Sequence, residues 1–212
     1  MGPRGDPQLQ EATVKGIALG FLAVALSFGV GSCGKKQVQL PPKGPALVDF
    51  KLTDQSGQEV GLSTYRGKIW VAGFIFTKCP SVCPTVTRAM AGLQGKLKAA
   101  SLEAELVTFT VDPETDTPAI LKEYGEDAGA DFDSWRFLTA RDVPTMRSVV
   151  EGNFATAMGE KHAMSAGMYD IAHTTKLVLV GRGGHRRGYF SSDPAGIQRV
   201  LAAVEALSQA RE

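Results

Sequence analysis

The chain has 212 residues, of which 43% are hydrophobic and 21% are charged, and its formal net charge is +1. This composition is typical of one globular domain with a terminal extension, and the absence of a stretch rich in both Lys or Arg and aromatic residues argues against a nucleic-acid-binding protein. Three cysteines are too few for a disulfide-stapled scaffold, so a hydrophobic core has to stabilise the fold.

The N-terminal segment, residues 1–33, is predicted to be a lipoprotein signal peptide or a membrane anchor. Residues 16–30 are apolar and uncharged and follow Arg4 and Lys15, which is typical of a secretory signal or a short anchor. The run ends in Val30-Gly-Ser-Cys33-Gly, which resembles a bacterial lipobox with Cys33 as the lipid-bearing residue. The alternative is an uncleaved anchor. Both place the domain in the bacterial cell envelope, outside the cytoplasm and tethered to a membrane.

Residues 34–46 contain three prolines and two glycines and are predicted to be a linker. The domain is expected over residues 47–210. Hydrophobic periodicity within it predicts strands and four helices. The predicted strands cover residues 47–52, 59–62, 68–77, 105–111, 135–138, 174–180 and 186–190, and the helices begin at Pro84, at Asp116 or Pro118, at Asp142 and at Asp193.

The order of these elements predicts an α/β fold. A hairpin comes first, followed by alternating strands and helices, a second hairpin and a last helix. This order is that of a thioredoxin-like central mixed sheet flanked by helices, with an N-terminal β-hairpin and an insertion loop at residues 154–172. Ligands bind beyond the carboxyl ends of strands in such sheets. Cys79, Cys83 and Asp112 all follow such strand ends.

The segment Cys79-Pro-Ser-Val-Cys83-Pro84 is the main candidate for chemistry. Pro84 suits the first position of a helix, so both thiols are expected near a helix N-terminus, where negative charge is favoured and thiol pKa values are depressed. Three interpretations remain open: a structural disulfide, a redox pair, and a metal site in which two thiolates select Cu(I) or Zn.

A third ligand is sought among the three histidines. His185 lies in a Gly-Gly turn and is expected on the solvated surface, and His162 lies in the insertion loop. His173 directly precedes a predicted strand. In thioredoxin-like folds the segment entering that strand packs beside the first cysteine and usually carries a cis-proline, but residues 145–193 contain no proline. We therefore predict that His173 joins the two cysteines as a metal ligand.

Three stretches together resemble the Sco/SenC family of thioredoxin-like copper-binding cytochrome c oxidase assembly proteins. They are Thr77-Lys-Cys79-Pro-Ser-Val-Cys83-Pro, Thr110-Val-Asp112-Pro-Glu-Thr-Asp116-Thr-Pro, and His173 before a β run. The resemblance covers about residues 47–207. It implies that Cys79, Cys83 and His173 bind one copper ion, as Cu(I) or also as Cu(II).

The resemblance implies a copper chaperone, rather than an enzyme, for the dinuclear copper site of cytochrome c oxidase. The alternative it leaves open is a thiol-disulfide oxidoreductase that keeps the cysteines of that site reduced through Cys79 and Cys83. The implied partners are the copper-site subunit of the oxidase and an upstream periplasmic copper donor, with no nucleic acid.

The sequence departs from the family pattern at two places. Lys78 stands where the family often has histidine, and Tyr169-Asp170-Ile-Ala172 precedes His173 where the family usually has an acidic residue beside the histidine. Asp170 is a candidate for orienting His173. Asp112 is expected either to hydrogen-bond near the thiols or to cap the following turn.

The insertion loop contains Met158, Met164 and Met168 as well as His162. Methionine side chains commonly fill irregular gaps in a core, and these three are expected to do so beneath the loop. The alternative is an auxiliary site through which copper enters or leaves.

Overall fold

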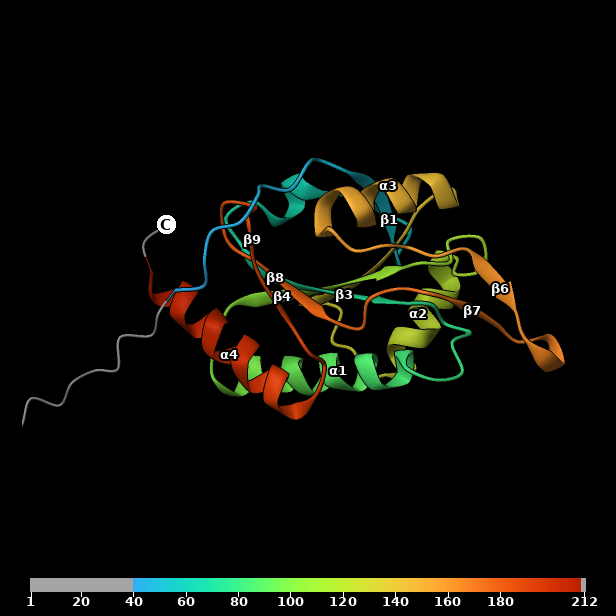
Figure 1. Cartoon of the computed structure of the whole chain (residues 1–212). Helices are drawn as coiled ribbons and strands as arrows, with labels where there is room; N and C mark the ends of the chain where they lie inside the picture. The colour runs from blue at the N-terminus through green and yellow to red at the C-terminus, as the bar shows by residue number, and fades with distance from the viewer. Residues whose placement is uncertain (1–39, 211–212) are drawn as a thin grey trace, which may run out of the picture. The chain divides into compact units, whose positions relative to one another are not determined.

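The centre of the fold is a seven-stranded mixed sheet with the strand order β2-β1-β5-β4-β3-β8-β9 (Figure 1). This computed structural model describes residues 40–210. Strands β3, β4 and β5 are parallel, and the strands on either side of them are antiparallel. The strands are β1 (Lys51–Asp54), β2 (Glu59–Gly61), β3 (Ile69–Ile75), β4 (Ala104–Thr110), β5 (Trp135–Thr139), β8 (Leu177–Val180) and β9 (Arg186–Phe190).

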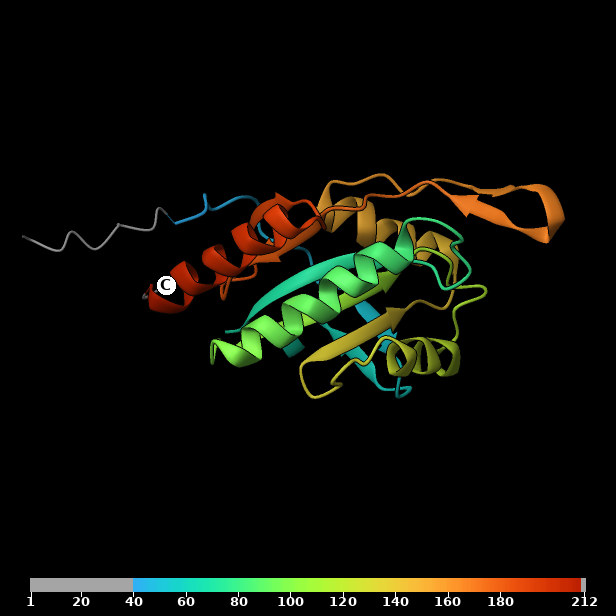
Figure 2. The same ribbon diagram turned by 90° about the horizontal axis from the view of Figure 1, so that it is seen from below.

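Helices cover both faces of this sheet. They are α1 (Cys83–Ala99), α2 (Pro118–Asp127), α3 (Val143–Phe154) and α4 (Pro194–Gln209), and a 3-10 turn, η1 (Leu62–Tyr65), follows β2. Helices α1 and α4 lie on one face and α3 on the other (Figures 1 and 2). The predicted α/β arrangement of the thioredoxin-like type, with its N-terminal hairpin, is therefore confirmed.

The helix starts follow their local sequence. A side-chain oxygen accepts a hydrogen bond from a first-turn N–H at the residue that precedes α2, α3 and α4, and a proline lies in each first turn. Helix α2 begins at Pro118, one of the two predicted starts, and its cap is Thr117, so Asp116 lies just before the helix. Helix α1 begins at Cys83 rather than Pro84, and no side chain of Val82 caps it.

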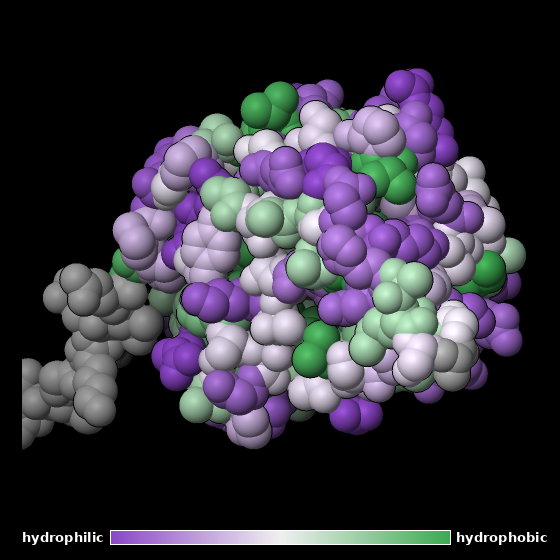
Figure 3. Space-filling model, turned by 45° about the vertical axis from the view of Figure 1, so that its right-hand side comes forward, coloured by the Kyte–Doolittle hydropathy of each residue, from purple (hydrophilic) through white to green (hydrophobic). Residues whose placement is uncertain are grey.

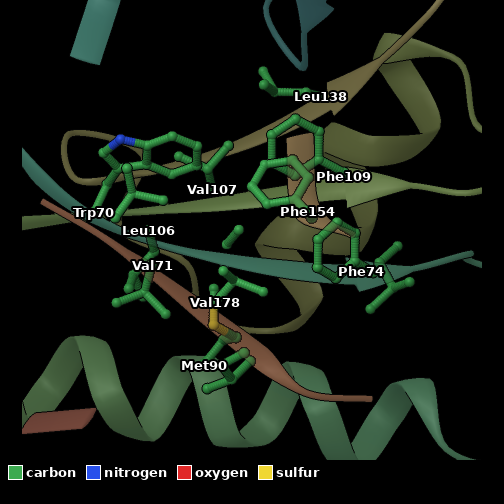
Figure 4. Close-up of a cluster of buried hydrophobic side chains, with 14 of the residues drawn as sticks. Trp70, Val71, Phe74, Met90, Leu106, Val107, Phe109, Leu138, Phe154 and Val178 are labelled. Atoms are coloured by element: carbon green, nitrogen blue, oxygen red, sulfur yellow. The ribbon is translucent and has the colours of Figure 1, made fainter. Parts of the chain in front are cut away.

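The core forms on both faces of β3 because alternate side chains of a strand point in opposite directions. Trp70 and Phe74 lie on the α3 side with Phe109 and Phe154, whereas Val71 lies on the side of α1 (Figure 4). All five side chains are fully buried. Every position of β3 is buried. Packing on both faces therefore fixes the position of this strand and of the cysteine loop that follows it.

Two predicted boundaries differ from the structure. The first strand is β1 at Lys51–Asp54 rather than 47–52, because residues 44–47 pair with the β8–β9 turn instead: Gly44 N–H donates to Arg186 O at 2.8 Å and Leu47 N–H to Gly184 O at 2.8 Å. His185 takes part in this docking through Nδ1, 2.9 Å from Gly44 O, and is half-buried rather than fully solvated.

The predicted insertion loop at 154–172 contains a β-hairpin. Strands β6 (Lys161–Ala163) and β7 (Tyr169–Ile171) pair antiparallel around the 3-10 turn η2 (Ser165–Gly167). Both ribbon views show this hairpin extending beyond the end of the sheet (Figures 1 and 2). The strand predicted at 174–180 is shortened to β8, because residues 172–176 connect the hairpin to the sheet.

The predicted signal peptide or anchor, with Cys33, lies outside the described residues, as do residues 34–39 of the predicted linker. Among the helices of residues 40–210, none has both the length and the apolar character needed to cross a bilayer.

Candidate metal centre

The two cysteines lie where β3 passes into α1. The chain leaves β3 through the buried Phe76, and Cys79 N–H donates to Phe76 O at 3.2 Å in a tight turn. Cys83, the first residue of α1, donates its N–H to Cys79 Sγ at 3.4 Å. The sulfur of Cys79 thus accepts one of the N–H groups that a helix N-terminus leaves unpaired. Both residues are free thiols, with exposed fractions of 7% for Cys79 and 1% for Cys83.

The two thiols differ in acidity. Burial alone would raise the pKa of Cys79, but hydrogen bonds from Cys83 and Ser81 outweigh it and lower the pKa below its ordinary value. Burial raises the pKa of Cys83 far above its usual range, and the hydrogen bond to Cys79 adds to this. The prediction that both thiols have depressed pKa values is therefore wrong for Cys83, because the more deeply buried sulfur pays the larger desolvation cost.

His173 meets Cys83 from the segment between β7 and β8. Its Nε2 lies 3.5 Å from Cys83 Sγ, and its Nδ1 lies 2.6 Å from the carbonyl oxygen of Ile171. A carbonyl oxygen only accepts hydrogen bonds, so Nδ1 is the donor to Ile171 O, and Nε2 is the nitrogen that faces the thiol. The ring also packs edge-on against Phe76, with centroids 5.7 Å apart. The sequence predicted contact with the first cysteine, but His173 contacts the second.

The three predicted ligands are neighbours. Two sulfurs and one imidazole nitrogen are the soft and borderline donors that Cu(I) prefers, so the donor set fits this ion. Within residues 40–210, no three His, Cys, Asp or Glu side chains already have the arrangement of a metal-ligand set. Cys83 therefore contacts both Cys79 and His173, but the three side chains do not have the arrangement of a complete coordination shell.

Asp170 does not hold the ring of His173. Its side chain is exposed on β7, where Asp170 pairs with His162 of β6, and the Nδ1 position is taken by Ile171 O. Lys78, the residue before Cys79, is also exposed. His162 lies in the hairpin strand β6 rather than beside the cysteines.

A buried carboxylate just before α2, that of Asp116, supports the cysteine loop. Asp116 accepts hydrogen bonds from Thr77 N–H at 3.1 Å and Thr77 Oγ1 at 2.5 Å, and also from Thr110 Oγ1. It is fully buried, and burial raises its pKa. Because Ile75 of β3 pairs with Thr110 of β4, Asp116 ties together the two segments that leave the sheet at this edge.

Asp112 binds the insertion hairpin rather than the thiols. Its carboxylate accepts hydrogen bonds from Tyr169 Oη at 2.6 Å and from Lys161 Nζ at 3.0 and 3.1 Å. Tyr169 in turn stacks on Phe76, with centroids 5.5 Å apart. Asp112 is 1% exposed. The contact therefore fastens both hairpin strands to the end of β4, and with them the segment that carries His173.

Replacing Asp112 by Asn is expected to lower the free energy of unfolding by ~1.5–3 kcal/mol at pH 7, the usual range for hydrogen bonds to a charged group. Burial alone would raise the pKa of Asp112, but the hydrogen bonds from Tyr169 and Lys161 outweigh it and leave the pKa below 3.8. The stabilisation is thus complete above pH 3.8 and lost as the pH falls through the folded-state pKa.

Urea unfolding of wild type and Asp112→Asn over this pH range checks the expectation. The difference between the two proteins should shrink as the solution becomes more acidic. A difference that stays constant with pH would contradict an ionised Asp112 as the source of the stabilisation. The exposed pair of Lys51 and Glu59 offers a control, because Glu59→Gln should have little effect at any pH.

The methionines of the insertion separate into two groups. Met158 is 2% exposed and fills a gap, as predicted, and Arg147 donates hydrogen bonds to the carbonyl oxygens of Met158 and Gly159. Met164 and Met168 are 52% and 42% exposed, so the gap-filling interpretation is wrong for them. The two hairpin strands have only three residues each. They are too short to show a clear alternation of hydrophobic residues, so the sequence did not reveal the hairpin.

Comparison with known proteins identifies the family. The SCO1/SenC family model matches residues 39–209. A SCO1 protein homolog of Bacillus subtilis is 31% identical over 171 residues, which are 81% of this chain and 84% of that protein.

Two solved structures are similar over most of the domain. A SCO1/SenC family lipoprotein from Bacillus anthracis is 28% identical, with a TM-score of 0.73 over 81% of this chain and all of that one. The copper-bound ScoI of Bradyrhizobium japonicum is 27% identical, with a TM-score of 0.63 over 76% of this chain and 98% of that one. The chain belongs to the SCO1/SenC family.

Proposed function

We propose that the chain is a membrane-tethered copper chaperone that holds copper as cargo through Cys79, Cys83 and His173 for the dinuclear copper site of cytochrome c oxidase. The observation that supports this most directly is the 3.5 Å contact between His173 Nε2 and Cys83 Sγ. It joins residues that are 90 positions apart in the chain, and it places an imidazole nitrogen beside a thiol.

The three side chains have distinct roles in this proposal. Cys79 has the lowered pKa and is the first thiolate available to an arriving Cu(I) ion. Cys83 lies between the other two ligands and gives up its proton when copper binds. His173 completes the set and is the neutral ligand, so a thiol or imidazole of the receiving protein displaces it at the smallest electrostatic cost.

His173→Ala is expected to lower the Cu(I) affinity of the chain by more than ~100-fold, beyond the usual effect of losing an outer-shell partner of a ligand. Anaerobic titration against a competing Cu(I) chelator measures this. His185→Ala is the matched control, because His185 contacts Gly44 O in the turn between β8 and β9 and should leave the affinity unchanged. Equal affinity of wild type and His173→Ala would remove His173 from the site.

The alternative function is thiol-disulfide exchange, and the unequal thiol pKa values favour it as the second candidate. Cys79 thiolate would attack a disulfide of the oxidase copper site and form a mixed disulfide. Cys83 thiolate would then attack Cys79, releasing the second substrate thiol and leaving a Cys79–Cys83 disulfide, with two electrons passed to the substrate. BsSco, a solved member of the Sco family, has a disulfide switch.

The same His173→Ala variant separates these two functions. Disulfide exchange needs only the two sulfurs, so single-turnover reduction of an oxidised copper-site fragment should persist when His173 is absent. The chain is better described as an oxidoreductase if that reduction persists in His173→Ala and if wild type binds Cu(I) no more tightly than His173→Ala does.

The proposed setting is the bacterial cell envelope, with the domain outside the cytoplasm and Cys33 as the lipid-bearing residue. The Bacillus anthracis relative is a lipoprotein, which supports a lipid anchor over an uncleaved helix. The proposed partners are the copper-site subunit of the oxidase and an upstream periplasmic copper donor.

A further inference from the structure

One face of the insertion hairpin carries metal-binding side chains that the centre described above does not use. The hairpin register pairs Lys161 with Ile171, His162 with Asp170 and Ala163 with Tyr169. Met164 N–H then donates to Met168 O at 2.7 Å, and both methionines have extended backbone dihedrals. The pairing of strands therefore continues by one step, with Met164 directly opposite Met168.

Alternation along a strand places cross-strand partners, and residues two positions apart, on the same face. His162, Met164, Met168 and Asp170 consequently share one face. All four are exposed, with exposed fractions of 52% for Met164 and 42% for Met168.

The opposite face of the hairpin is the one fastened to the domain. Ile171 is 3% exposed, Tyr169 stacks on Phe76, and Lys161 donates to Asp112. These contacts fix which face points outward. On the side of the molecule that Figure 3 shows, hydrophobic residues appear as separate small patches among hydrophilic ones.

The chemistry of the outward face suits a soft monovalent cation. Cβ atoms of directly opposed residues are about 4.5–5.5 Å apart, and the flexible thioether side chains of a methionine pair can close on one ion. Cu(I) prefers thioether sulfur and imidazole nitrogen as ligands, whereas hard cations such as Mg²⁺ and Ca²⁺ prefer oxygen. The carboxylate of Asp170, opposite His162, supplies negative charge beside the same ligands.

We propose that Met164, Met168 and His162 form an auxiliary Cu(I) site on the outward face of the hairpin. Strand β7 leads from this site through Ile171 directly to His173, so an ion bound there lies on the segment that carries a ligand of the main site. Passage of Cu(I) between the two sites is a ligand exchange without a change of oxidation state. This passage rests on the proposed function, whereas binding at the hairpin does not.

A chain in which all three cysteines are changed to Ser isolates the auxiliary site. Anaerobic titration of this chain with Cu(I) against a weak competing chelator should show one ion bound. Adding Met164→Leu and Met168→Leu should lower that affinity by at least about tenfold, because leucine keeps the volume of methionine without its sulfur. Adding Met158→Leu instead should leave it unchanged, since Met158 is 2% exposed.

A second measurement on the unmodified chain guards against misfolding of the cysteine-free variant. With methionine methyl groups labelled with ¹³C, Ag(I) serves as a diamagnetic probe for Cu(I) in NMR spectra. The methyl signals of Met164 and Met168 should shift as Ag(I) is added beyond the first equivalent, whereas the buried Met158 should not respond.

Unchanged affinity in the Met164→Leu/Met168→Leu chain, or methyl signals that stay fixed, would overturn the auxiliary site. Either result would leave Cu(I) binding by Cys79, Cys83 and His173 untouched, because the methionines are replaced in a chain without cysteines and the main site is titrated in chains that keep the methionines. Equal Cu(I) affinity of wild type and His173→Ala, with the hairpin titration as expected, would instead count against the proposed function alone.

Discussion

Cys83→Ser is expected to lower the Cu(I) affinity of the chain by at least ~10³-fold, or about 4 kcal/mol. Cys83 is the ligand that contacts both of the others: its N–H donates to Cys79 Sγ, and its Sγ lies 3.5 Å from His173 Nε2. Serine keeps the size of the side chain but replaces a soft thiolate by a hard hydroxyl, which Cu(I) binds poorly. The remaining thiol and imidazole are then left without the donor between them.

Competitive titration under anaerobic conditions measures this loss, and the sulfur-to-copper charge-transfer absorption in the ultraviolet reports how many thiolates remain bound. Ser81→Ala is the matched control, because Ser81 Oγ lies 3.9 Å from Cys79 Sγ within the same loop but offers no soft donor. The Cu(I) affinity of Ser81→Ala should stay within about threefold of wild type. This is less than the tenfold change that corresponds to 1.4 kcal/mol. Wild-type affinity in Cys83→Ser would mean that copper is held elsewhere.

Phe154→Ala is expected to lower the free energy of unfolding by ~3–5 kcal/mol, the range for removing a large aromatic side chain from a core. The ring of Phe154, the last residue of α3, is fully buried. Its centroid lies 5.0 Å from that of Phe109, 5.1 Å from Phe74 and 6.1 Å from Trp70. Alanine would leave a cavity bounded by three rings of two neighbouring strands, which the rigid sheet cannot close.

Urea unfolding followed by tryptophan fluorescence tests this expectation, since Trp70 contacts the lost ring. Val48→Ala is the control: Val48 is 69% exposed, and its replacement should change stability by no more than ~0.5 kcal/mol. A loss below ~1 kcal/mol for Phe154→Ala would show that neighbouring side chains refill the space. The folded variant should keep the Cu(I) affinity of wild type, because Phe154 does not contact the three ligands.

That Cys79, Cys83 and His173 lie close together could be predicted because each of them has a signal in the sequence. Cys79 and Cys83 follow an unbroken apolar run and precede a proline, and His173 precedes the strand that borders that run. The cysteines follow the carboxyl end of β3, and β8 runs antiparallel to β3 and so begins at the same edge of the sheet. The order of elements was therefore enough to place these residues together. The side chain that His173 contacts depends on distances of a few ångströms, which element order does not specify.

The supporting residues could not be predicted in the same way. Asp112 and Asp116 are two acidic residues of one turn, but Asp116 binds threonines of β3 and β4 whereas Asp112 binds the hairpin. That division depends on which carboxylate points beneath the loop. The unequal pKa values of the two thiols likewise follow from burial depth rather than from spacing.

The hydrogen bond from His173 Nδ1 to Ile171 O bears on the proposed transfer of copper to another protein. The group that fixes the proton of the ring belongs to the same short segment as the ring itself. We expect the ring to keep this hydrogen bond whether or not a metal ion is bound, because the donor and the acceptor lie only two residues apart. Capture and release of copper at Nε2, as proposed above, would then require no change at Nδ1.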